Sequence, residues 1–153
     1  WTPDGARVVF VSSSRDHKRA WVRVADARTG AVRTLIEETS PTQIGDASLD
    51  EHLWQVLPES EELVWWSQRD GWVHLYLHDL ATGRLKNRIT TGDGNVTTIV
   101  HVDPRARQLF FVAQGREAGR DPYFQHLYRV GLDGKGLTLL TPEDAHHTVE
   151  FAP

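Results

Sequence analysis

The chain has 153 residues, enough for one buried core, and its 39% hydrophobic content with six tryptophans argues against disorder. A net charge of −4 without a basic stripe excludes nucleic acid as an electrostatic partner. The absence of cysteine excludes disulfides, thiolate metal sites and a cysteine nucleophile, and leaves the compartment open. No apolar run approaches the roughly 20 residues of a membrane span. Because methionine is absent even at position 1, we expect a piece of a longer protein.

Strand patterns begin near the N-terminus. The first unit has segments rich in β-branched and aromatic residues, bounded by Gly, Asp and Ser turns. These segments predict strands over residues 7–12, 20–25 and 32–36. The turn at 27–30 ends on Gly30, a residue type that adopts positive φ at no steric cost.

The middle unit predicts strands over residues 52–57, 62–67, 72–79 and 85–90. In the third of these, Val73, Leu75 and Leu77 share one face, while His74 and Tyr76 lie on the other. Bulky residues on both faces predict a sheet packed between two neighbouring sheets. A helix over 48–56 is the alternative for the first strand, since Ser48 with Glu51 forms a capping box.

The third unit predicts strands over residues 98–102, 108–113, 125–130 and 137–140, and one more strand is expected over 147–151. A unit that recurs about every 50 residues indicates a repetitive β-architecture, most often a propeller. The predicted fold is therefore all-β: a partial β-propeller of about three four-stranded antiparallel blades. The blades are expected over residues 1–40, 50–92 and 97–142, with the first strand of a further blade over 146–153.

Three blades do not close a ring, because natural propellers have about 4–8 blades. Two apolar faces are therefore expected to need a cover. The rest of a longer chain, a second copy in a homodimer, or disorder are the three ways to meet that need.

The stretch SQRDGWVHLYLHDLATGRL, residues 67–85, resembles the N-terminal propeller of the dipeptidyl peptidase IV branch of the prolyl oligopeptidase family of serine peptidases. The closing ITTG at 89–92 and DPYFQHLYRV at 121–130 extend the resemblance, which is colinear over essentially the whole chain. The resemblance implies an eight-bladed propeller that caps an α/β-hydrolase domain, with the Ser-Asp-His triad between them. It also implies that this piece shapes and gates the cavity that peptides enter.

The chain itself is expected to carry no catalytic residue. A hydrolase nucleophile needs a Gly-x-Ser-x-Gly elbow, and no serine here has that setting. The resemblance implies a Glu pair that grips the substrate amino terminus, but Glu37-Glu38 and Glu61-Glu62 lack the family's context for it. Both pairs are interpreted as solvated turn carboxylates.

No metal or cofactor is predicted. His74 and His78 are four residues apart, which on a strand separates them by about 13 Å. One zinc ion needs its ligand atoms at about 2.1 Å, so these two histidines do not share an ion. His74 is expected to be a packed, hydrogen-bonded ring. The Asp93-Gly94 turn lacks the Gly-Lys-Ser/Thr of a phosphate loop.

The connection at 45–51 holds the candidates for substrate contact. A loop between consecutive blades can open onto the face that meets the hydrolase domain. Asp46, Asp50 and Glu51 are therefore the candidate cavity-lining residues, with an ordinary surface loop as the alternative.

The sequence thus predicts part of a dipeptidyl peptidase IV-like serine exopeptidase, whose parent removes N-terminal dipeptides after Pro or Ala. The expected partners are the α/β-hydrolase domain of the parent chain and a peptide substrate. The alternative is a non-catalytic TolB-like propeller that works through protein contacts.

Overall fold

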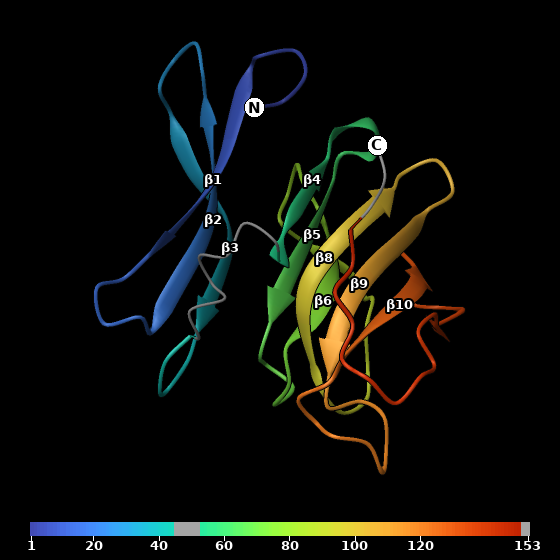
Figure 1. Ribbon diagram of the computed structural model, residues 1–153. Helices are drawn as coiled ribbons and strands as arrows, with labels where there is room; N and C mark the ends of the chain where they lie inside the picture. The colour runs from blue at the N-terminus through green and yellow to red at the C-terminus, as the bar shows by residue number, and fades with distance from the viewer. Residues whose placement is uncertain (45–52, 151–153) are drawn as a thin grey trace.

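The computed structural model describes residues 1–44 and 53–150, and these form three antiparallel sheets in succession along the chain (Figure 1). The first sheet contains β1 (Arg7–Ser13), β2 (Arg19–Asp26) and β3 (Val32–Thr39). The second contains β4 (Gln55–Leu57), β5 (Glu62–Ser67), β6 (His74–Asp79) and β7 (Leu85–Arg88), with the 3-10 turn η3 (Pro58–Ser60) between β4 and β5. The third contains β8 (Asn95–Asp103), β9 (Gln108–Gln114), β10 (Gln125–Gly131) and β11 (Thr138–Leu139).

In every sheet the strands are neighbours in the order in which they follow in the sequence. Such meanders, stacked side by side without closing, are the blades of a partial β-propeller. The predicted fold class is therefore confirmed. None of the helical segments in the described part of the chain is long and apolar enough to cross a bilayer.

Each predicted strand up to residue 140 overlaps an observed one. The helical alternative over 48–56 fails at its end, because Gln55 and Val56 pair with β5 as part of β4. Its earlier residues lie largely outside the described part. The strand expected over 147–151 is not formed within residues 147–150, and residue 151 lies outside the described part. A strand needs a ladder partner, and this segment meets β10 through the bond from His147 N to Gln125 O, 3.1 Å.

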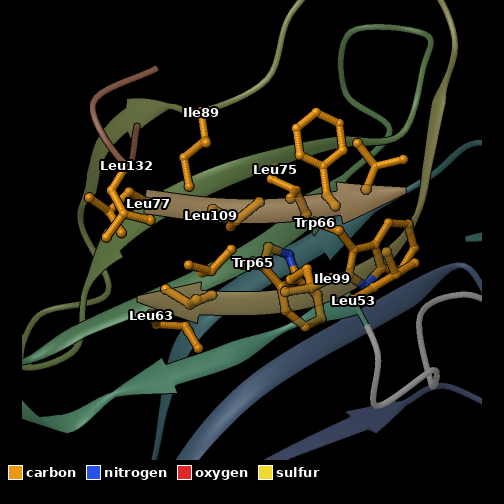
Figure 2. Packing of buried hydrophobic residues seen from close by; sticks show 14 of the residues in the cluster. Leu53, Leu63, Trp65, Trp66, Leu75, Leu77, Ile89, Ile99, Leu109 and Leu132 are labelled. Carbon is orange, nitrogen blue, oxygen red and sulfur yellow. The ribbon is translucent and has the colours of Figure 1, made fainter. Parts of the chain in front are cut away.

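The core lies between the sheets, and Figure 2 shows part of it, including the two tryptophans of β5. Trp65 and Trp66 are 0% and 1% exposed, with ring centroids 5.8 Å apart. All six residues of β5 and all but the last of β6 are buried. Both faces of the second sheet are thus covered by neighbouring sheets, as the bulky residues on both faces predict.

A repeated Asp-x-x-Thr-Gly sequence builds the turns from β2 to β3 and from β6 to β7. Asp26 Oδ1 accepts hydrogen bonds from Thr29 N at 2.7 Å and Oγ1 at 2.9 Å, and Asp79 Oδ1 accepts the same pair from Thr82. These bonds to Thr29 and Thr82 lower the pKa of both carboxyls.

Gly83 closes the second of these turns and brings the first two sheets into backbone contact. Its φ is +75°, and a Cβ on it would lie 1.9 Å from Leu35 O of β3. Gly30 has nearly the same φ, +72°, yet a Cβ there would meet no atom within 4 Å. Gly30 is therefore required only for its positive φ, whereas Gly83 is required both for its positive φ and for the close approach of β3.

We expect Gly30→Ala to lower the free energy of unfolding by about 1 kcal/mol, the cost of positive φ for an L-residue. Gly83→Ala should cost about 2–4 kcal/mol, because the methyl group also pushes β3 away from the second sheet. Urea unfolding followed by circular dichroism measures both values. Equal losses in the two variants would show that the sheets do not approach at Gly83.

Candidate functional site

We define the β5–β6 face as the end of the sheets that carries the β5–β6 and β9–β10 turns and the segment after β3. That segment is tied down at Ile44, which is buried and donates its N–H to His17 O at 2.7 Å. The chain re-enters the core at Leu53, which is 1% exposed. The predicted cavity-lining residues Asp46, Asp50 and Glu51 fall between these two anchors and lie outside the described residues.

Glu38 belongs to this face, and its interpretation as a solvated turn carboxylate is wrong. It lies in β3 with its side chain 14% exposed, and it forms an ion pair with Arg69. Ser67 Oγ donates to Glu38 Oε2 at 3.0 Å and accepts from Arg69 Nε at 2.8 Å. The three groups tie the outer strand of the first sheet to the β5–β6 turn. Glu37 is exposed, as predicted.

Arg69 also stacks on an aromatic ring of its own sheet. Its guanidinium carbon lies 4.5 Å from the centroid of the Tyr76 ring, a cation–π distance. The Tyr76 hydroxyl donates to Asp70 Oδ2 at 2.6 Å, and Arg88 Nη1 donates to the same oxygen at 2.6 Å. Burial, together with the bond to Asp70, raises the pKa of Tyr76 to about 12. The phenol is therefore a fixed hydrogen-bond donor near neutral pH.

The third sheet repeats this arrangement. Arg116 lies over the Tyr128 ring at 5.5 Å, and the Tyr128 hydroxyl donates to Glu117 Oε1 at 2.7 Å. Burial is the main cause that raises the pKa of Tyr128, and the hydrogen bond to Glu117 raises it further. The sequence signal for the motif is an Arg-Asp or Arg-Glu pair followed by His-Leu-Tyr, which occurs at 69–76 and at 116–128. These segments carry the family resemblance in the sequence, but the stacking of each arginine on its tyrosine was not predicted from them.

The buried histidines have structural roles. His74 is 2% exposed and shares a 3.2 Å hydrogen bond between its Nδ1 and Thr90 Oγ1, which confirms its prediction as a packed, bonded ring. His78 Nδ1 lies 2.9 Å from Gly83 O. Burial is the main cause that lowers the pKa of both rings, so they are neutral near pH 7. Within residues 1–44 and 53–150, no three imidazole or carboxylate groups are placed to hold one metal ion.

At the opposite end of the sheets, the prediction for the second Glu pair is wrong for one of its two residues. Glu62 is 1% exposed and forms ion pairs with Lys86 and with Arg107, whose Nη1 lies 2.6 Å from Oε2. Glu61 is exposed and pairs with Arg7 at 2.7 Å. The two adjacent carboxylates therefore bond to opposite neighbours, the first sheet and the third. Only Glu61 fits the predicted solvated turn residue.

The described residues form hollows at both ends of the sheets. On the β5–β6 face, a hollow of about 330 Å³ is lined by residues that include Glu38, Ile44, Trp66 and Arg69. On the other end, a hollow of about 480 Å³ is lined mainly by polar residues of the third sheet, among them Arg129. The first hollow combines an apolar floor with a charged rim, which is the usual make-up of a ligand site.

This geometry supports binding and not acyl transfer. The Ser67 hydroxyl, which lines the hollow, donates to a carboxylate and accepts from a guanidinium. A nucleophilic serine needs a free base that takes its proton and an oxyanion hole beside it, whereas the carboxylate next to Ser67 is held in an ion pair with Arg69.

Comparison with known proteins then places the chain. Residues 1–153 match the family described as the dipeptidyl peptidase IV (DPP IV) N-terminal region. The chain belongs to this family.

Curated relatives of the DPP IV N-terminal region domain agree with that assignment. A protein named probable dipeptidyl peptidase 4 from Arthroderma benhamiae is 26% identical over 151 residues, 97% of this chain and 17% of the relative. Dipeptidyl peptidase 4 of Arthroderma otae is 30% identical over 88 residues, 56% of this chain and 11% of the relative. The chain thus spans less than a fifth of the length of these relatives.

Solved structures share the fold of the DPP IV N-terminal region domain. Dipeptidyl peptidase 4 of Porphyromonas gingivalis superimposes with a TM-score of 0.74 at 18% identity, over 90% of this chain and 18% of that one. TolB of Acinetobacter baumannii superimposes with a TM-score of 0.61 at 19% identity, over 95% of this chain and 32% of that one. Both similarities concern the propeller architecture.

The Glu61-Glu62 pair provides a test of the charged contacts between sheets. Burial raises the pKa of Glu62, but hydrogen bonds from Arg107 and Lys86 outweigh it and lower that pKa from 4.5 to about 2. A lowered pKa in the folded state stabilises the protein above pH 4.5, and this stabilisation is lost as the pH falls toward 2. We expect Glu62→Gln to cost about 2 kcal/mol at pH 7 and to flatten the pH dependence between these limits.

Glu61→Gln is the matched control, because its ion pair is exposed and should contribute less than about 0.5 kcal/mol. Urea unfolding at a series of pH values measures both variants. A Glu62→Gln variant with the pH profile of the unmodified protein would contradict the buried role of this carboxylate.

Proposed function

We propose that this domain is part of the propeller of a serine exopeptidase that removes N-terminal dipeptides after Pro or Ala. In that protein it shapes and gates the substrate cavity and supplies no catalytic residue. The observation that carries the proposal is the family match over residues 1–153, together with relatives named dipeptidyl peptidase 4. The lack of a Gly-x-Ser-x-Gly elbow in the chain supports the second part of the proposal, that the domain supplies no catalytic residue.

The proposed partners are an α/β-hydrolase domain of the parent chain and a peptide substrate. We place the contact with both at the β5–β6 face. Asp46, Asp50 and Glu51 remain the proposed cavity-lining residues. Their placement is supported by the two anchors, Ile44 and Leu53, which set where the connection leaves and re-enters the core.

A second candidate function is that of a non-catalytic, TolB-like propeller that acts through protein contacts. The observation in its favour is the superposition of TolB over 95% of this chain. The two candidates differ in what accompanies the propeller. A peptidase needs a hydrolase domain in the same polypeptide, whereas a binding propeller does not.

The purified chain should not hydrolyse a Gly-Pro chromogenic substrate, because none of its serines lies in a Gly-x-Ser-x-Gly sequence. The sequence of the surrounding gene should encode a Gly-x-Ser-x-Gly elbow followed by Asp and His. Turnover by the pure chain would contradict the absence of catalytic residues. A surrounding gene without the elbow would favour the binding propeller.

We also propose blades at residues 1–40, 50–92 and 97–142. Residues 146–153 become the first strand of a further blade only in the parent chain, since residues 147–150 form no strand in the structure. The end sheets then each have one face without a neighbouring blade. In β1, Val9 and Val11 pack on the core, so Val8 and Phe10 lie on the opposite face and are half-exposed. We propose that a second copy covers such faces in the isolated chain.

Self-association should appear as a dimer in light scattering at micromolar concentration, dissociating on dilution. Phe10→Ser should shift that equilibrium toward monomer, because it removes apolar area from the open face. Trp72→Ser, a change at an exposed aromatic residue away from β1, is the matched control. A well-behaved monomer at all concentrations would contradict the proposed homodimer.

A further inference from the structure

The hollow on the β5–β6 face has the dimensions and lining of a site for a small ligand. The hollow has a volume of about 330 Å³ and lies between the segment after β3 and the start of the β5–β6 turn. Pro41, Ile44 and Trp66 form its apolar lining, and the last two are 6% and 1% exposed. An apolar group that enters from water is therefore shielded on a surface that the core already holds rigid.

The polar groups of the hollow have hydrogen-bond donors to spare. A guanidinium has five N–H groups, and Arg69 uses Nε for Ser67 and one N–H of Nη2 for Glu38. The Arg69 side chain is 36% exposed, so the remaining N–H groups are accessible. The Trp66 indole N–H is buried beneath the hollow and is not among these accessible donors. The ligand that this set favours brings acceptors, as a carboxylate or a carbonyl does.

Glu38 fixes where that acceptor must bind. Together with Ser67 it holds one edge of the guanidinium, and the Tyr76 ring covers one of its faces at 4.5 Å. The free edge of Arg69 is thus oriented before any ligand arrives, and a pre-ordered guanidinium loses less entropy on binding a carboxylate.

We propose that this hollow binds the C-terminal end of a short peptide whose last residue is apolar. The carboxylate lies on the free edge of Arg69, and the last side chain packs on Trp66 and Ile44. This inference rests on the proposed function, because a dipeptide released after Pro is such a molecule. It adds a product-binding position between the first two sheets, at residues other than the predicted cavity-lining residues Asp46, Asp50 and Glu51.

The test is a nuclear magnetic resonance titration of the 153-residue chain. Six tryptophans give six indole N–H signals, and Trp66→Phe assigns the one of interest. Gly-Pro should shift the Trp66 signal and saturate. Gly-Pro-amide, which lacks the carboxylate, should bind at least about tenfold more weakly, because a charge-assisted bidentate contact is lost. Gly-Asp should also bind more weakly, since it exchanges an apolar side chain for an acidic one.

Variants locate the contact. Arg69→Gln should abolish the shift, and Arg69→Lys should restore part of it, because the charge returns without the planar fork. Arg116→Gln is the matched control, since Arg116 has the equivalent stacked position in the third sheet. It should leave the affinity for Gly-Pro unchanged. If Arg69→Gln does not fold, the comparison of Gly-Pro with its amide on the unmodified chain still decides.

Equal affinity for the acid and the amide would overturn the proposal, and so would shifts that spare the Trp66 indole. An effect of Arg116→Gln as large as that of Arg69→Gln would also overturn it. These outcomes are independent of the peptidase assignment, which the surrounding gene decides. A gene with the hydrolase elbow and a chain that ignores Gly-Pro would leave the proposed function standing and remove this inference alone.

Discussion

The whole arrangement depends on the apolar character of both faces of each sheet. A single sheet of this kind cannot bury both of its apolar faces, so each face must pack against another sheet. The second sheet shows the consequence, since β5 is buried along its full length between the two others. Its two tryptophans, Trp65 and Trp66, bury large apolar area at the centre of the arc. Face-to-face stacking is thus the condition for stability, and every other feature adjusts how the sheets stack.

Charged contacts sit at the edges of these stacked faces and set how one sheet lies on the next. Glu38 bonds across the first junction at the β5–β6 face, and Glu61 bonds across the same junction at the opposite end. Glu62 bonds across the second junction, to Arg107 of the third sheet, at the end opposite to the β5–β6 face. A buried ion pair pays a desolvation penalty that offsets much of its attraction, so its contribution is better understood as specificity of geometry than as net stability. Apolar packing holds the sheets together, and the charged edges select one alignment.

The fold could be predicted from the sequence because its determinants are local. Side chains that alternate between the two faces of a strand, Gly turns and a repeat of about 50 residues can all be recognised in short segments of sequence. Strands such as β5 and β9 begin at the residues where these signals predict them. The roles of Glu38 and Glu62 could not be predicted in this way. Their partners, Arg69 and Arg107, lie 31 and 45 residues away, and only the stacking of sheets brings them together. A residue that looks like a turn carboxylate becomes a buried contact when a neighbouring sheet covers it.

The same reasoning explains why a binding site can arise at one junction of a repetitive fold. Arg69 and Arg116 occupy equivalent positions, each stacked on the tyrosine of its own sheet and each reaching back toward the preceding one. Arg116 meets a backbone carbonyl there, that of Thr91 at 2.6 Å. Arg69 meets the carboxylate of Glu38, beside a hollow with an apolar floor. The repeat places a stacked arginine in both the second and the third sheet. The residues of the preceding sheet differ at the two junctions, and only those beside Arg69 leave this hollow with an apolar floor.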